Sequence, residues 1–248
     1  MKASEQRLAA ITHLLDETRQ VDIRALAERF SVSTMTIRRD LASLEALGLL
    51  VRTFRGGIAA PDAAHPTRVD TSPVKRAIGQ LAAALVTPGQ TIIVDAGTTT
   101  LEVVRNLPRD AGLTLVTNSL PAAQEVRGSG MRIVLLGGYL SDDEVRIYGP
   151  MTEACLASLH ADLLFVGCVG ACGARGFYMS DLHLTSNVRA MMRATDRVVV
   201  TAESYKFRQP SLSCYAQPSE VAIVVTDDGL PTRDRALLEE QGVRVLTA

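Results

Sequence analysis

Residues 33–41 carry side chains of the types that recognise DNA. The segment is Ser-Thr-Met-Thr-Ile-Arg-Arg-Asp-Leu, so a serine that can cap a helix precedes threonines and two adjacent arginines. Arginine can hold a guanine edge with two hydrogen bonds or clamp a phosphate, and short side chains let a helix approach base edges. The segment therefore predicts a helix whose first turns face DNA, although an ordinary surface helix with a basic pair would have the same composition. The candidate DNA contacts here are Ser33, Thr34, Met35, Thr36, Arg38, Arg39 and Ser43.

A second group of residues could hold a small anionic ligand. Residues 95–100 are Asp-Ala-Gly-Thr-Thr-Thr and come directly before a predicted helix. Backbone N–H groups at a helix start, the helix dipole and three hydroxyls are suited to a phosphate. Plain helix capping would use the same threonines. Further polar or glycine-rich segments follow other predicted strands, and the candidate ligand contacts are Asp95, Gly97, Thr98, Thr99, Thr100, Thr117, Asn118, Gly137, Gly138, Glu203 and Lys206.

The arginine pair requires a helix with a buried opposite face. At about 100° per residue, Ile37, Leu41 and Leu44 fall on one side and predict the inward face. Met35 and Arg39 fall opposite to them. The pattern predicts an amphipathic helix that presents its arginines outward.

The neighbouring elements predict a winged helix-turn-helix. Residues 4–17 have the spacing of an amphipathic helix, and Asp22 can cap a second helix over Ile23–Phe30. Ser31 and Val32 then form a turn before the arginine-bearing helix. Residues 49–55 are extended, and Gly56-Gly57 is expected to turn the chain back into Ile58. Two arginines of this wing, Arg52 and Arg55, are candidate contacts with phosphate or the minor groove.

The rest of the chain predicts an α/β domain with a mostly parallel, Rossmann-like sheet. Seven short runs rich in Val, Ile and Leu alternate with helix-sized segments, as strands buried on both faces do. Ligands of such sheets bind beyond the carboxyl ends of the strands, where the candidate ligand contacts stand. The runs are residues 91–95, 113–117, 132–136, 162–166, 197–201, 221–226 and 243–246.

A proline-containing segment separates the two parts. Residues 61–73 contain three prolines and no hydrophobic period, which is typical of a semi-rigid linker. The expected organisation is a winged helix-turn-helix domain over residues 1–60, this linker, and an α/β sensor domain over residues 74–248.

Composition limits the class of protein. Residues 1–60 hold nine Lys and Arg against seven Asp and Glu, a net charge of +2, whereas the remainder has −3. No apolar run approaches the roughly 18 residues that a membrane span needs, and charges occur throughout residues 1–17. We therefore expect a cytoplasmic protein without membrane contact. The four cysteines and four histidines have no metal-site spacing, so we expect no metal and no cofactor; a redox pair of Cys168 and Cys172 is the alternative to core or loop cysteines.

The N-terminal part resembles the DeoR family of bacterial transcriptional regulators. Its wing departs from the family pattern, because Phe54 replaces the usual histidine and Arg55 is interposed before Gly56-Gly57. The residues that fit the family signature in register are Arg7, Ile11, Leu15, Ser33, Thr36, Ile37, Arg38, Arg39, Asp40 and Leu41.

The sensor part resembles the effector domain of the same family, which is related to ribose-5-phosphate isomerase and senses phosphorylated sugars. The resemblance implies that residues 97–100 hold a phosphate and that Lys206 pairs with its charge or with a sugar oxygen. In two places the chain departs from the family: Thr185-Ser186 stands where a Glu-Ala pair is usual, and Glu203 replaces an aspartate. These changes alter which hydroxyls the site can recognise.

The resulting hypothesis is a homodimer or homotetramer that represses a carbohydrate-catabolic operon. Two winged domains bind operator DNA, and a phosphorylated sugar or polyol releases them. The alternatives are a sugar-phosphate isomerase-like enzyme, for which Asp95, Glu203, Asp227 and Lys206 are candidate acid-base groups, and an activator with a non-phosphorylated effector. The predicted DNA-binding domain argues against the isomerase-like enzyme, because a metabolic enzyme would have no use for it.

Overall fold

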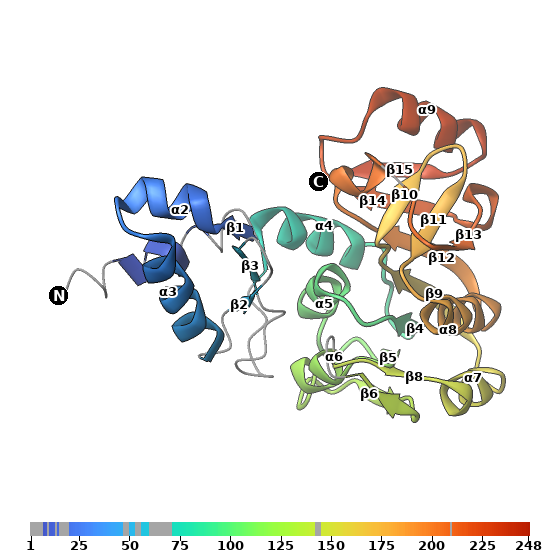
Figure 1. Cartoon of the computed structure of the whole chain (residues 1–248). Helices are drawn as coiled ribbons and strands as arrows, with labels where there is room; N and C mark the ends of the chain where they lie inside the picture. Colours follow the sequence, from blue (N-terminus) through green and yellow to red (C-terminus); the bar gives the residue numbers. More distant parts are fainter. Residues whose placement is uncertain are drawn as a thin grey trace. The chain divides into compact units, whose positions relative to one another are not determined.

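The computed structural model contains two compact units, Met1–Val69 and Asp70–Ala248 (Figure 1). It describes residues 7, 8, 10–12, 14, 20–46, 50–52, 56–59, 71–141, 145–208 and 210–248, without the side chains of residues 20, 46, 51, 52, 58 and 59. Arg55, Phe54 and the predicted linker residues 61–70 lie outside the described residues, as does the side chain of Arg52. None of the helices in the described part is long and apolar enough to cross a membrane.

The helices of the first unit begin where the capping residues predict. Helix α2 (Ile23–Phe30) follows Asp22, whose carboxylate accepts hydrogen bonds from the backbone N–H groups of Arg24 and Ala25. Ser31 ends this helix in the left-handed conformation, with φ of 52°. Helix α3 (Thr34–Ala46) begins after Ser33, whose hydroxyl accepts the N–H of Thr36 at 3.1 Å. These boundaries confirm the predicted helix-turn-helix.

The inward face of α3 is also confirmed. Ile37, Leu41 and Leu44 are buried and pack in one cluster with Ile11, from the first helical segment, and with residues of α2. Apolar burial on this face fixes which side of α3 remains exposed.

A small antiparallel sheet completes the first unit, and one detail of the prediction was wrong. Strand β2 (Leu50–Arg52) pairs with β3 (Gly56–Ala59), which also pairs with β1 (Gln20–Asp22), a strand the sequence did not indicate. Gly56 and Gly57 therefore lie within β3 and do not form the turn. A Cβ on Gly56 would lie 1.7 Å from the carbonyl oxygen of Val21, so the close approach of β1 requires glycine there.

The second unit is built on a seven-stranded sheet within the described residues 71–248. All its neighbouring strands are parallel, and every predicted run corresponds to one strand within a few residues at each end. The order across the sheet is β15-β14-β12-β9-β4-β5-β6. The strands are β4 (Thr91–Val94), β5 (Thr114–Thr117), β6 (Arg132–Leu135), β9 (Ala161–Val166), β12 (Thr195–Thr201), β14 (Ile223–Thr226) and β15 (Arg244–Thr247).

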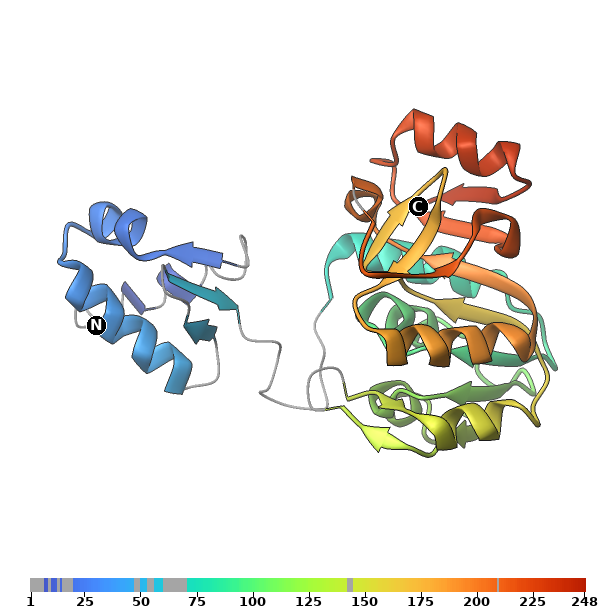
Figure 2. The same ribbon diagram turned by 45° about the vertical axis from the view of Figure 1, so that its right-hand side comes forward.

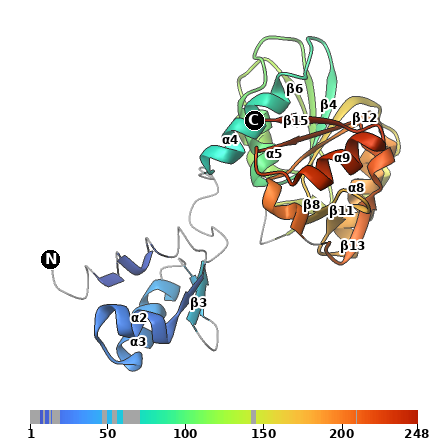
Figure 3. The same cartoon turned by 90° about the horizontal axis from the view of Figure 1, so that it is seen from above.

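Helices cover both faces of this sheet. Helices α4 (Pro73–Ala83), α5 (Thr98–Arg105) and α6 (Leu120–Glu125) lie on one face. Helices α7 (Pro150–Leu156), α8 (Leu182–Arg193) and α9 (Thr232–Glu240) lie on the other (Figures 2 and 3). The strand order reverses at β4, and right-handed connections in opposite directions along the sheet place the helices on opposite faces. Helix α4 begins at Pro73, so this residue belongs to the sensor and not to the predicted linker.

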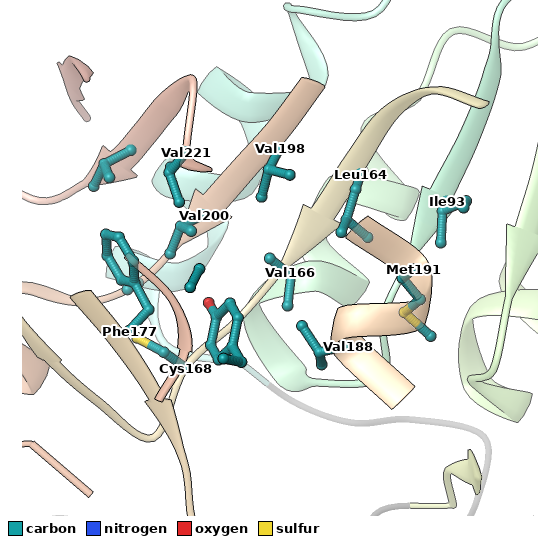
Figure 4. Close-up of a cluster of buried hydrophobic side chains, with 14 of the residues drawn as sticks. Ile93, Leu164, Val166, Cys168, Phe177, Val188, Met191, Val198, Val200 and Val221 are labelled. Atoms are coloured by element: carbon teal, nitrogen blue, oxygen red, sulfur yellow. The ribbon is translucent and has the colours of Figure 1, made fainter. Parts of the chain in front are cut away.

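The core of the sensor alternates along the strands. Figure 4 shows Leu164 and Val166 of β9 and Val198 and Val200 of β12 in one apolar cluster with Val188 and Met191 of α8. The residues between them point to the face covered by α4 and α5, since successive strand side chains alternate. Burial on both faces explains why the strand sequences are almost continuously apolar.

Several short elements were not predicted. A hairpin of β7 (Tyr139–Leu140) and β8 (Ile147–Tyr148) follows β6. A three-stranded antiparallel sheet of β10 (Gly170–Cys172), β11 (Gly176–Met179) and β13 (Ser213–Ala216) follows the ends of β9 and β12. The sequence interpretation did not identify these strands, because they are short and lack the nearly continuous Val, Ile and Leu pattern of the buried sheet strands.

Candidate functional site

Helix α3 presents an exposed polar face. Thr34, Arg38, Arg39 and Ser43 are exposed, Thr36 is half-buried, and Met35 is 72% exposed despite its apolar side chain. The hydroxyl of Ser43 donates to the carbonyl of Arg39 at 3.1 Å, and the Ser33 hydroxyl caps the helix, so both have local bonds. The candidate base and phosphate contacts that project outward are therefore Thr34, Met35, Arg38 and Arg39.

A paired carboxylate orients this helix. Arg7 donates from Nε to Asp40 Oδ2 at 2.6 Å and from Nη2 to Asp40 Oδ1 at 3.2 Å. Asp40 is buried, and the hydrogen bond raises the pKa of Arg7 above its ordinary value against the opposing effect of burial. The two-point contact joins the first helical segment to α3 directly beside Arg39. Both residues belong to the signature quoted above, but their contact could not be read from their types.

The strand order of the sensor sheet reverses between β4 and β9. Strands β4 and β9 are neighbours, and the chain proceeds from them in opposite directions across the sheet. Open parallel sheets bind ligands beyond the carboxyl ends of their strands at such a reversal. Asp95, Ala96 and Gly97 follow β4 at this point, and Gly167 and Cys168 follow β9.

Asp95 anchors the segment that follows β4. Its side chain is 1% exposed, accepts a hydrogen bond from Asn118 Nδ2 at 3.0 Å and lies 3.4 Å from Arg146 Nη1. Arg146 also donates to the carbonyl of Ala96 at 2.7 Å, and the Asn118 side-chain oxygen accepts the N–H of Ala96 at 2.8 Å. The path of residues 95–96 is thus fixed by the side chains of Asn118 and Arg146, each of which contacts both Asp95 and the backbone of Ala96.

Arg146 is the residue that sequence reasoning missed. It lies on the β7–β8 hairpin, 51 positions after Asp95, and forms an isolated bridge with Ser119. An arginine in an unrecognised hairpin gave no signal of its own. The signal that could have found it is Asp95 at the end of an apolar run, because a carboxylate that is buried needs a partner.

The threonines of the predicted phosphate cradle differ in accessibility. Gly97 and Thr98 are exposed at the start of α5, whereas Thr99 and Thr100 are buried. The Thr100 hydroxyl donates to the carbonyls of Asp95 and Gly97. Thr117 is likewise buried, with its hydroxyl donating to the carbonyl of Val94 at 2.6 Å. Among the candidates at this edge, Gly97 and Thr98 are accessible to solvent, whereas the hydroxyls of Thr100 and Thr117 are bonded to the backbone.

The segment after β12 approaches the same edge. Lys206 donates from Nζ to the carbonyl of Cys168 at 2.6 Å, directly after β9. The Oε1 atom of Glu203 lies 3.7 Å from Nζ of Lys75 on α4. Cys168 itself is a core residue, and burial raises the pKa of its thiol to about 11 although the Lys206 charge lowers it. Lys206 is therefore near the β4–β9 reversal, and Glu203 follows the carboxyl end of the neighbouring strand β12.

Gly137 and Gly138 stand apart from the other candidates. They follow β6, the outer strand of the sheet, and are separated from β4 by β5. Gly137 accepts a hydrogen bond from the Thr152 hydroxyl at 2.7 Å, and a Cβ on Gly138 would lie 2.5 Å from the same oxygen. Their structural role is the close packing of the β7–β8 hairpin on α7.

Comparison with known families accounts for both units. A model of the DeoR-like helix-turn-helix domain matches residues 7–64, and a model of the DeoR C terminal sensor domain matches residues 71–228. The chain belongs to the DeoR family. It is a DNA-binding transcriptional regulator of this family and not an enzyme.

Relatives match over nearly the whole chain. A transcriptional repressor, AccR, from Agrobacterium fabrum is 33% identical over 93% of this chain and 92% of its own length. The lactose phosphotransferase system repressor of Streptococcus mutans is 28% identical over 90% of this chain and 92% of its own. Among solved structures, ribose 5 phosphate isomerase A from Neisseria gonorrhoeae covers 53% of this chain and 52% of its own, with 14% identity and a TM-score of 0.39.

We expect the Arg7–Asp40 contact to stabilise the DNA-binding unit of the DeoR-family chain. Asp40→Asn should lower the free energy of unfolding of this unit by about 1–3 kcal/mol, because it weakens a buried charge-assisted pair. Urea unfolding followed by circular dichroism measures this, with Glu28→Gln on the exposed side of α2 as the matched control. The double variant with Arg7→Ala should lose less than the sum of the single losses; strictly additive losses would contradict the contact.

We expect Arg146 to be essential for the stability of the sensor. Arg146→Met removes the cation that pairs with the buried Asp95 carboxylate, which should cost about 3–5 kcal/mol of sensor stability. Arg132→Met, the same change at an exposed position of β6, is the control and should have little effect. A sensor transition in urea at the same midpoint for both variants would refute this role.

Proposed function

We propose that the chain is a repressor of a carbohydrate-catabolic operon and that a phosphorylated sugar or polyol releases it from operator DNA. The observation that carries the proposal is the coexistence of an outward-facing arginine pair on α3 with an anion-suited edge in the sensor. Two relatives are named as repressors, one of them of a lactose phosphotransferase system, which supports the direction of regulation and the sugar link.

The chemistry of the sensor edge favours a phosphate. Gly97 and Thr98 are exposed at the start of α5, where N–H groups lack intrahelical partners and the helix dipole is positive. Lys206 adds a positive charge within the same part of the sheet edge. Glu203 offers carboxylate oxygens to sugar hydroxyls. Together these groups suit a ligand with an anionic end and a hydroxylated end.

The proposed regulator acts as a homodimer or homotetramer. A single DNA-contacting helix such as α3 reaches only a few base pairs. Two winged units related by a two-fold axis would contact two half-sites. Effector binding then changes operator affinity by favouring one arrangement of the subunits over another, typically by 1–3 kcal/mol of coupling.

Arg39 should carry sequence-specific contact with the operator. Arg39→Ala should weaken binding to a duplex selected from a random library by about 10- to 100-fold, since a bidentate arginine–base contact contributes about 1–3 kcal/mol. Fluorescence anisotropy at several salt concentrations measures the loss. The control is Arg233→Ala, which removes an exposed arginine from α9 of the sensor. Equal affinities for the two variants would rule out the assignment.

A phosphorylated sugar should raise the melting temperature of the sensor, because a ligand of the folded state stabilises it by mass action. The screen compares glucose 6-phosphate, fructose 1-phosphate, galactose 6-phosphate and glycerol 3-phosphate with their unphosphorylated parents. Thr98→Asp should abolish the shift: its charge repels a phosphate yet suits the helix start, so the fold is preserved. Thr98→Ser keeps the hydroxyl and should retain the shift.

Two results would contradict the effector proposal. A shift produced only by the unphosphorylated compounds would favour an effector of another class. A phosphate-dependent shift that persists in Thr98→Asp would place the ligand elsewhere in the sensor.

A further inference from the structure

The chain enters the sensor at the edge that carries the candidate effector contacts. Helix α4 precedes β4 and lies on the face of the sheet together with α5. Its first turn contains Lys75, which pairs with Glu203 after the carboxyl end of β12 at 3.7 Å. The start of α4, where the polypeptide arrives from the DNA-binding unit, is therefore at the ligand edge and not at the opposite end of the strands.

A buried carboxylate fixes this entry point. Thr71 is 6% exposed, and its hydroxyl donates to Oε1 of Glu102, which is 3% exposed on α5. Arg105 lies 2.5 Å from the same oxygen of Glu102 and also contacts Glu125. Arg76 donates to the carbonyl of Thr71. Buried charges need complete sets of partners, so a movement of Glu102 would also move Thr71, which is hydrogen-bonded to it.

Helices α4 and α5 pack against each other at Glu102. A Cβ placed on Gly79 of α4 would lie 2.3 Å from Cβ of Glu102 and 2.5 Å from its carbonyl carbon. The backbones of α4 and α5 are thus in direct contact, and neither helix can slide over the other without repacking.

Helix α5 connects this junction to the candidate phosphate contacts. Glu102 follows Thr98 by four residues on one short helix, a separation of about 6 Å along the axis. Ligand contact at Gly97 and Thr98 acts on the first turn of the helix whose next turn holds Thr71. Glu203 provides a second connection, through Lys75, from the other candidate effector segment.

We propose that Thr71, through Glu102, and Lys75, through Glu203, are the positioning residues that transmit effector binding to the DNA-binding unit. This proposal rests on the proposed function, since it assumes that the sensor edge binds the effector. It assigns a regulatory role to Thr71 and Lys75, neither of which is a candidate contact with the ligand or with DNA.

Thr71→Val tests the proposal in the full chain, because it removes the hydroxyl donor and keeps the shape of the side chain. Thr71→Ser, which keeps the hydroxyl, is the matched control. Operator affinity is measured by anisotropy with the selected duplex, without ligand and with a saturating concentration of each sugar phosphate of the screen above. Calorimetric titration of the same compounds gives effector affinity without DNA.

The wild-type chain and Thr71→Ser should lose operator affinity by about 5- to 150-fold with the active compound, the usual range of allosteric coupling. For Thr71→Val, the fold-loss of operator affinity caused by the active compound should be less than about a third of the wild-type fold-loss. Its operator affinity without ligand and its effector affinity should both stay within about twofold of wild type. A structural role alone would lower the melting temperature and leave the ratio of the two operator affinities unchanged.

The outcomes separate this proposal from the proposed function. A wild-type chain that responds to none of the compounds contradicts both. If the wild type responds and Thr71→Val responds equally, the double variant Thr71→Val/Lys75→Met decides, with Thr71→Ser/Lys75→Arg as its control. An undiminished response of that double variant at saturating ligand overturns the junction while the proposed function stands.

Discussion

The burial of the Asp95 carboxylate at the β4–β9 reversal is the constraint on which the sensor edge depends. A carboxylate that is 1% exposed is tolerated only when other groups replace its water, and here Asn118 and Arg146 do so. Both side chains also bind the backbone of Ala96, so the requirement of one charge fixes the path of the chain into α5. Gly97 and Thr98 are presented to solvent as a consequence.

The first unit uses the same device for a different purpose. Asp40 on α3 is buried and joined at two points to Arg7, which fixes the rotation of a helix whose other face carries Arg38 and Arg39. In each unit the groups suited to binding are exposed, while a buried acid–arginine contact close to them sets their position. This separation of positioning from contact is a physical reason why the second and third residues of Arg-Arg-Asp differ in role, although they are adjacent in the chain.

Local signals predicted the elements, and long-range contacts escaped prediction. Asp22 and Ser33 predicted the starts of their helices, because a cap acts within three residues. The seven apolar runs predicted the seven sheet strands, because burial on both faces produces a continuous apolar pattern. By contrast, Gly56 looked like a turn residue, because its contact with Val21 involves a strand 35 positions earlier. Arg146 and the Thr71–Glu102 contact were missed for the same reason. The candidate ligand contacts follow the carboxyl ends of the strands, as the topology predicts, although Gly137 and Gly138 lie apart at the outer strand β6. Which hydroxyls are exposed depends on packing that no single segment encodes.

Hydrogen exchange of the full chain, followed by mass spectrometry with and without a sugar phosphate that raises the melting temperature, tests the central claim most directly. The account predicts slower exchange of the backbone amides of residues 97–101 and of residues 72–76, because the ligand binds at the start of α5 and the start of α4 is joined to it. Protection confined to other segments, with residues 97–101 unchanged, would contradict the claim that the Asp95-anchored edge is the effector site.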